Sequence, residues 1–208
     1  MYQTSFNNKT PSSNIVVNVK ITTLESSALV KYESKHCFDK LCMLGCPTYG
    51  NKWSCPPYSP KFSEYQSDMY PYAILVLFWC TLDQFNYAKT EFIKVKASNS
   101  ILKSRMDKFM RNLEQTLGGV VLSNGSCRLC NPCNKKKNEN CKKPTEMRFS
   151  MESLGLDVGR ITTDFFNHPL LWYKDKKIPT YSSVISCLLT KDTIQEASLD
   201  YIVQMQLI

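Results

Sequence analysis

The chain has 208 residues, of which 43% are hydrophobic, and 26 Lys and Arg against 18 Asp and Glu give it a formal net charge of +8. This composition suits one compact domain with its own core and excludes a disordered polymer. The longest apolar run, Ala73–Cys80, is far shorter than the ~20 residues that span a bilayer, and the first residues lack the apolar core of a signal peptide, so we expect a cytoplasmic protein without a membrane segment.

The first part of the chain predicts two strands and an irregular segment. The polar residues 1–13 predict a flexible N-terminus, and the single domain is expected over residues 14–208. Alternating β-branched residues predict a half-buried strand over Asn14–Leu24, and a second short strand is expected at Ala28–Tyr32. The segment Cys37–Pro60 is rich in Cys, Pro and Tyr without a period of 2 or 3.6, which predicts a loop.

The middle of the chain predicts a strand followed by a helix. Tyr72–Leu82 reads as a strand buried on both faces. One apolar stripe at spacings of three and four residues then predicts a helix; its members are Leu102, Met106, Phe109, Leu113 and Leu117. Ser98 or Ser100 is expected to cap the start of this helix, and Gly118-Gly119 is expected to end it.

The last third predicts two strands around a second irregular segment and another helix. Val120–Ser123 is expected as a short strand, and Asn124–Phe149 as the second cysteine-rich loop. Ser150 is expected to cap a helix that runs to about Phe166, with Glu152 in its first turn. Tyr181–Thr190 is expected as a buried strand. A terminal helix is expected after Lys191.

The order of these elements predicts the fold class. Strand, helix, strand, helix and strand follow one another from Tyr72 onward, which favours right-handed crossover connections. We therefore expect a single compact α/β domain with a mainly parallel or mixed sheet, crossover helices and two irregular cysteine-rich loops, at 37–60 and 124–149.

Ten cysteines are the strongest chemical signal of the chain. In a reducing cytosol, clustered cysteines bind metal or do redox chemistry more often than they form disulfides. Cys80 and Cys187 lie inside predicted buried strands, where thiols are usually inert, so we place them outside any site. The remaining eight are the candidate cofactor and metal ligands: Cys37, Cys42, Cys46 and Cys55 in one set, and Cys127, Cys130, Cys133 and Cys141 in the other.

The second of these sets contains the more informative spacing. Cys127, Cys130 and Cys133 form a C-x2-C-x2-C triplet, which is typical of iron–sulfur proteins, and Cys141 follows. Four-cysteine zinc sites more often present two separated pairs, so zinc is the alternative. In two-cluster ferredoxins the fourth cysteine of a run ligates the other cluster, which leaves an exchange of Cys55 and Cys141 between the sets open.

The first set, with spacings of five, four and nine residues, matches no standard zinc finger. Cys46 and Cys55 are each followed by proline, as is common at cluster ligands, where proline fixes the turn. Nearby aromatic side chains are candidates to shield a metal from water or simply to pack the core. These residues are Tyr49, Trp53 and Tyr58.

The segment Arg128–Arg148 carries much of the positive charge. It contains seven basic residues and two acids, an excess of +5. Such a run is a solvated loop by default, but it also suits a docking face for an acidic partner protein or for a nucleic-acid backbone. No aromatic residue lies between Arg128 and Arg148, which favours a protein partner over nucleic acid.

Two blocks of the sequence resemble one known family. The blocks are Cys42-x3-Cys46-Pro-x-Tyr49-Gly-x2-Trp53-Ser-Cys55-Pro-Pro and Gly125-x-Cys127-Arg-Leu-Cys130-x2-Cys133, the latter followed by Cys141-x2-Pro144 and Ser150-Met-Glu152-x2-Gly155-x-Asp157. Together they resemble the predicted metal-binding proteins of domain of unknown function 2284, over about Cys37 to Cys187. The resemblance implies metal binding through these cysteines, in proteins common among anaerobic bacteria and archaea, and it implies no particular reaction. The Lys-rich insert Lys135–Asn140 departs from the family pattern and makes Cys141 the least secure ligand of its set.

Three functions from different classes follow from these patterns. The first is an iron–sulfur protein with two [4Fe-4S] clusters that serves in electron transfer or in redox support of a partner enzyme. The second is an enzyme in which one cluster has an open iron that handles sulfur or a small substrate. The third is a structural zinc protein that binds RNA through its basic loop. Eight cysteines give four per centre, which favours electron transfer, and no catalytic residue is identified.

Overall fold

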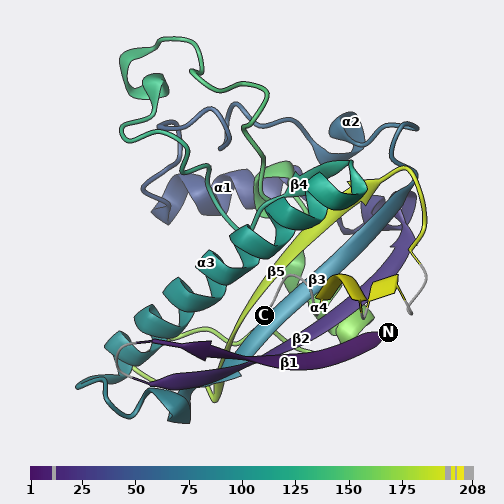
Figure 1. The fold of residues 1–208 in the computed structure, drawn as a ribbon. Helices are drawn as coiled ribbons and strands as arrows, with labels where there is room; N and C mark the ends of the chain where they lie inside the picture. The colour runs from purple at the N-terminus through teal and green to yellow at the C-terminus, as the bar shows by residue number, and fades with distance from the viewer. Residues whose placement is uncertain (11–12, 195–197, 200, 204–208) are drawn as a thin grey trace.

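The computed structural model describes residues 1–10, 13–194, 198–199 and 201–203. One sheet of five strands dominates this part of the chain (Figure 1). The strands are β1 (Tyr2–Lys9), β2 (Asn14–Glu25), β3 (Tyr72–Thr81), β4 (Val120–Leu122) and β5 (Tyr181–Thr190). Their order across the sheet is β1-β2-β3-β5-β4, and every neighbouring pair is antiparallel.

The prediction of a mainly parallel or mixed sheet is therefore wrong, and the reason lies in the last strand. A helix does connect β3 to β4, as expected for a crossover, but β4 does not pair with β3. Instead β5 lies between them and pairs antiparallel with both. Alternation of strands and helices predicts parallel neighbours only when strands consecutive in sequence pair with each other. Here β5, which comes later in the chain, separates β3 from β4.

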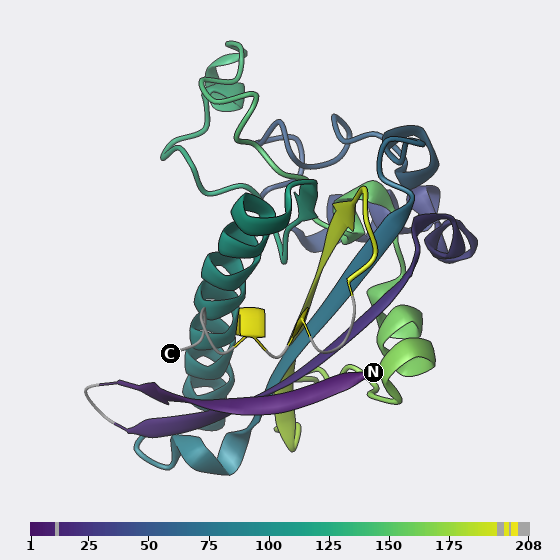
Figure 2. The same cartoon turned by 45° about the vertical axis from the view of Figure 1, so that its right-hand side comes forward.

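Four α-helices and four short 3₁₀ helices accompany the sheet in the described residues up to 194. The α-helices are α1 (Lys35–Gly45), α2 (Phe62–Tyr65), α3 (Glu91–Leu117) and α4 (Val158–Phe166). The 3₁₀ helices are η1 (Ser26–Tyr32), η2 (Leu82–Phe85), η3 (Asn134–Lys137) and η4 (Glu152–Leu154). Figure 2 shows α3 and α4 on opposite sides of the sheet.

The core accordingly has two halves, one on each face of the sheet. Ile74, Val76 and Phe78 of β3 pack toward α3, where they meet the predicted apolar stripe of that helix. Leu75 and Leu77 point to the other face and pack with η4 and α4. A strand with both faces buried reads as a continuous apolar run, so the prediction of a buried strand here is confirmed.

The long helix ends as predicted but starts earlier. It ends at Leu117, and Gly118 and Gly119 follow with positive φ values of 73° and 96°. Its N-cap is Thr90, whose hydroxyl accepts a hydrogen bond from the Ile93 N–H at 3.3 Å. The predicted start at Ser98 or Ser100 is wrong because the first turns of α3 are largely exposed and carry no buried apolar stripe.

Three further elements differ from the sequence-based expectation. Residues 1–13, expected as a flexible terminus, contain β1, which pairs along its whole length with β2. The short strand expected at Ala28–Tyr32 is part of η1. The helix expected from Ser150 is divided at Gly155, whose φ is 88°, into η4 and α4, and Asp157 rather than Ser150 caps α4.

The expected strands at Asn14–Leu24, Val120–Ser123 and Tyr181–Thr190 are confirmed as β2, β4 and β5. The terminal helix expected after Lys191 lies partly outside the described residues, of which 198–199 and 201–203 are helical. Within the described chain, no helix combines the length and apolar content needed to cross a membrane.

Candidate metal centre

The two cysteine-bearing segments lie together at one end of the sheet, at the top of Figure 1. Direct contacts join them. The indole N–H of Trp53 donates to the carbonyl of Glu139 at 3.0 Å, and the N–H of Cys127 donates to the hydroxyl of Ser54 at 3.1 Å. Lys52 donates from its ammonium to the carbonyl of Cys127 and to the Ser126 hydroxyl. The segments thus form one structural unit, although they are far apart in the sequence.

The first segment begins as a helix, so the expectation of an irregular loop over Cys37–Pro60 is wrong for its first half. Helix α1 carries Cys37 and Cys42, and Cys46 is its C-cap. Sequence periodicity missed α1 because the helix has no fully buried residue, and its Leu41 and Leu44 side chains are 63% and 79% exposed. Helix formation here brings Cys42 and Cys46, four residues apart, onto one face.

A largely buried lysine side chain fixes α1 on the domain. The ammonium of Lys35 donates to Asp39 at 2.7 Å, to the hydroxyl of Ser59 at 3.0 Å and to the carbonyl of Ser153 at 2.8 Å. Beside its backbone lies Gly155, where an added Cβ would stand only 2.6 Å from the Cα of Lys35. The close approach of α1 to this turn therefore requires glycine, and it sets the position of the cysteines on the helix.

Three thiols of the first set, those of Cys42, Cys46 and Cys55, lie near enough to influence one another, although not at the spacing of ligands to one metal ion. The hydroxyl of Thr48 lies 3.1 Å from the sulfur of Cys46 and 3.5 Å from that of Cys55. Burial raises the pKa of the Cys42 thiol, and the nearby Cys46 and Cys55 raise it further. Repulsion between neighbouring thiolates contributes to this rise. A cation placed among the three thiols would therefore oppose it and favour their thiolate forms.

Cys37 stands apart from this group. It is exposed, and it precedes Cys42 by five helical residues, which turns it by about 140° around the axis of α1. The structure therefore brings together Cys42, Cys46 and Cys55 and leaves Cys37 on another face of the helix.

The second set surrounds a small cavity. All four of its cysteines line this cavity of about 20 Å³, together with Trp53 and Met147. The set is Cys127, Cys130, Cys133 and Cys141. Cys141, the least secure ligand on sequence grounds, thus faces the same space as the C-x2-C-x2-C triplet.

Burial and nearby donors act in opposite directions on the thiol of Cys127. Burial raises the pKa of its thiol, while a hydrogen bond from the Leu129 N–H and the charge of Lys52 lower it. Backbone N–H donors and nearby cations of this kind stabilise thiolate and tune the potential of a metal group that it binds.

The donor sets fit an iron–sulfur group in chemistry. Each consists of soft cysteine sulfurs, the ligands that such clusters use. Among the described residues, no three His, Cys, Asp or Glu side chains stand close enough together to hold one metal ion. Trp53 and Met147 supply an apolar wall to the second set.

Aromatic side chains form part of this unit. The Trp53 and Tyr58 rings pack edge to face at 5.2 Å, and the ammonium of Lys135 lies 5.0 Å and 4.5 Å from their centres. Lys135, from the Lys-rich insert, is therefore not simply solvated: it packs across the first cysteine segment. Lys136 and Lys137 next to it are exposed.

The remaining cysteines lie in the core, and the two histidines differ in burial. Cys80 and Cys187 are buried in the two halves of the core, and burial raises the pKa of Cys80 to about 12. His36 is exposed on α1, whereas His168 is buried and its Nε2 lies 2.8 Å from the Ser183 hydroxyl.

Sequence reasoning missed three polar residues of the site: Thr48, Lys52 and Ser54. Each lies within three residues of a candidate cysteine, and this proximity was the feature of the sequence that could have marked it as a site residue. Their contacts with the cysteines, however, depend on how the two segments pack.

Comparisons with known proteins give one match, to a protein family. Comparison with curated proteins and with solved structures gives no significant match. A family model described as a predicted metal-binding protein, DUF2284, matches residues 28–190, which include both cysteine sets. This match extends over most of the chain and bears out the resemblance of the two cysteine blocks. The chain therefore belongs to the DUF2284 family of predicted metal-binding proteins.

Proposed function

We propose that the protein is an iron–sulfur protein with a [4Fe-4S] cluster on each cysteine set and that it transfers electrons to or from a partner. The observation that carries the proposal is the second set, in which a C-x2-C-x2-C triplet and a fourth cysteine line one cavity beside an apolar wall. The triplet spacing is typical of clusters, whereas zinc sites usually present separated pairs.

The identity of the metal is tested by composition and colour. Anaerobically purified or reconstituted protein is expected to be brown, to absorb broadly in the visible, and to contain iron and acid-labile sulfide. A colourless protein with about two zinc ions per chain and no sulfide would refute the proposal and favour the structural zinc alternative.

Proximity of the two sets supports electron transfer between two centres. A cleft of about 350 Å³ lies between the segments and is lined by Thr48 from the first and by Cys130 and Cys133 from the second. Thr48 also contacts two thiols of the first set, so the opening is lined by two cysteines of the second set and by a residue in direct contact with the first. An electron could thus enter at one centre and leave at the other.

An acidic redox protein is the partner that this surface fits best. Exposed lysines of the Arg128–Arg148 segment lie beside the second cysteine set; they are Lys136, Lys137, Lys142 and Lys143. Positive surface charge steers an acidic partner toward the centre at low ionic strength.

Charge neutralisation tests the docking. Changing Lys136 and Lys137 to Gln is expected to slow reduction by an acidic donor at low salt without changing the iron content. The matched control changes Lys176 and Lys177, an exposed pair outside the cysteine segments, and is expected to leave the rate unchanged. Equal rates for both double variants, without dependence on ionic strength, would refute docking at this segment.

A second candidate function, an enzyme with an open iron, is favoured by the place of Cys37. If only Cys42, Cys46 and Cys55 bind, one iron of that cluster has no cysteine ligand and can bind a substrate. Cys37→Ser is then expected to keep all iron, and an added small thiol is expected to change the electron paramagnetic resonance spectrum of the reduced cluster. Loss of that cluster in Cys37→Ser would refute the open site.

A further inference from the structure

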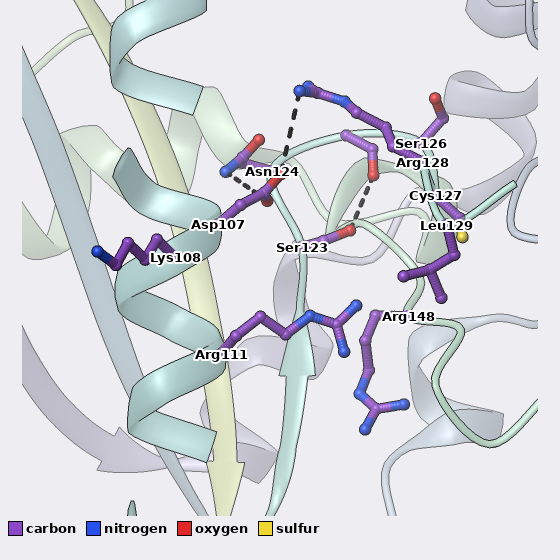
Figure 3. A pocket seen from close by; sticks show the side chains of 11 residues that line it. Asp107, Lys108, Arg111, Ser123, Asn124, Ser126, Cys127, Arg128, Leu129 and Arg148 are labelled. Atoms are coloured by element: carbon purple, nitrogen blue, oxygen red, sulfur yellow. Dashed lines mark hydrogen bonds and ion pairs between the residues drawn. The ribbon is translucent and has the colours of Figure 1, made fainter. Parts of the chain in front are cut away.

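Another cavity, of about 280 Å³, lies between α3 and the loop that follows β4 (Figure 3). It is distinct from the small cavity among the four thiols, but Cys127 borders both. Three arginines from separate parts of the chain line it: Arg111 of α3, Arg128 of the second cysteine segment and Arg148 at the end of that segment.

Two of these guanidinium groups are held in place by one carboxylate. The Nε of Arg148 donates to Glu114 at 2.7 Å, and Arg111 lies 3.5 Å from the other oxygen of the same group. Nη1 of Arg148 also donates to the carbonyls of Thr145 and Met147, and Nη1 of Arg111 donates to that of Glu146. A guanidinium carries five N–H donors, so these contacts fix both groups and leave donors for a ligand.

The third guanidinium faces them across the cavity. Nη1 of Arg128 lies 4.0 Å from a carboxylate oxygen of Asp107 of α3. The Arg128 side chain is 55% exposed, so this ion pair is weak. Asp107 also accepts a hydrogen bond from the Asn124 amide at 3.1 Å. Burial raises the pKa of the Asp107 carboxyl, and the charges of Arg128 and Arg111 oppose that rise.

The charge balance of the cavity is positive. Three guanidinium groups stand against the two carboxylates of Asp107 and Glu114, an excess of one positive charge. Lys108 also lines the cavity, but Figure 3 shows its ammonium pointing away from the arginines, so it is not needed for this balance.

We propose that this cavity binds the phosphate group of a small ligand. Arginine forks match the oxygens of phosphate, and groups on two sides of a cavity suit an anion with several oxygens better than a flat carboxylate. The volume lies near the lower end for ligand pockets, so the ligand is small. Because Cys127 borders the cavity, the bound molecule lies beside the second cysteine set.

The proposal is tested by calorimetric titration of the full-length, metal-containing protein with inorganic phosphate at fixed ionic strength. Wild-type protein is expected to bind phosphate with a Kd of about 1 mM or lower. Arg111→Gln and Arg128→Gln are each expected to weaken binding about tenfold, since each removes a charged donor. If Arg111→Gln does not fold, Arg128→Gln still tests the proposal. The Arg128 side chain is half exposed, so its replacement is expected to leave the fold intact.

Arg160→Gln is the matched control. This arginine is exposed on α4 and stacks on the ring of Tyr32, away from the residues that line the cavity. The substitution removes the same charge and is expected to leave phosphate binding unchanged. Absence of binding up to about 10 mM phosphate, equal binding by all variants, or equally tight binding of acetate would each overturn the proposal. The outcome does not depend on whether the cysteines hold iron or zinc.

Discussion

The buried histidine His168 should make stability depend on pH in a calculable way. Burial, with a smaller contribution from the ammonium of Lys20, lowers the pKa of its imidazole from the ordinary 6.5 to about 4. His168 is 7% exposed, its Nε2 lies 2.8 Å from the hydroxyl of Ser183, and its ring packs on Trp79 and Tyr181. The folded protein therefore resists protonation that the unfolded chain accepts readily.

The sign and size of the effect follow from this difference. Between pH 6.5 and pH 4 the unfolded state binds more protons, so the free energy of unfolding falls as the pH falls. His168 then costs about 2 kcal/mol at pH 5 and about 3 kcal/mol at pH 4, and almost nothing above about pH 7. For a chain of this size, about 2 kcal/mol corresponds to a loss of about 4–8 °C in Tm.

The assay compares wild-type protein with His168→Asn, in the same metal state, by urea unfolding at about pH 7.5 and about pH 5, which bracket the ordinary pKa of histidine. Asn cannot be protonated, so the variant should lose about 2 kcal/mol less than wild type on going to about pH 5. His36→Asn, at the exposed histidine, should follow wild type. Parallel curves for wild type and His168→Asn would refute the reasoning, whatever other groups titrate.

Three further predictions concern the site and its support. Cys130→Ser should remove the second centre and spare the first, so that iron and sulfide fall by about half; unchanged contents would show that the triplet is not a ligand set. Lys35→Met should lower the free energy of unfolding by about 2–3 kcal/mol in urea titration, because three hydrogen bonds to a charged donor are lost, and a change below about 0.5 kcal/mol would contradict that role. Gly155→Ala should cost about 2 kcal/mol or more and loosen α1, since its Cβ would clash with the backbone of Lys35; wild-type unfolding and metal content would refute this packing.

Sequence patterns predicted the strands best where burial imposes a clear pattern. The alternation in β2 and the apolar run of β3 have the expected positions because β2 buries one face against the core, whereas β3 buries both faces, one in each half of the core. The pairing of strands could not be predicted in the same way, because the insertion of β5 between β3 and β4 depends on contacts distant in sequence.

The candidate site shows the same division. The sulfur donors could be chosen from spacing alone, and the structure brings seven of the eight into two groups. The orientation of Cys37 could not be predicted, because α1 lacks a buried stripe that would reveal it as a helix. The arginine cavity was also invisible, since Arg111, Arg128 and Arg148 come together only when α3 packs beside the second cysteine segment.

The place of β5 also constrains the order of events during synthesis on the ribosome. Every other strand of the sheet is made before β5, yet β3 and β4 can join the same sheet only through it. Until Tyr181–Thr190 leaves the exit tunnel, β4, which leads into the second cysteine segment, has no strand to pair with. Any metal that the second cysteine set binds should therefore be loaded only after β5 has been made, and a nascent chain stalled before β5 should expose thiols that the finished protein partly covers.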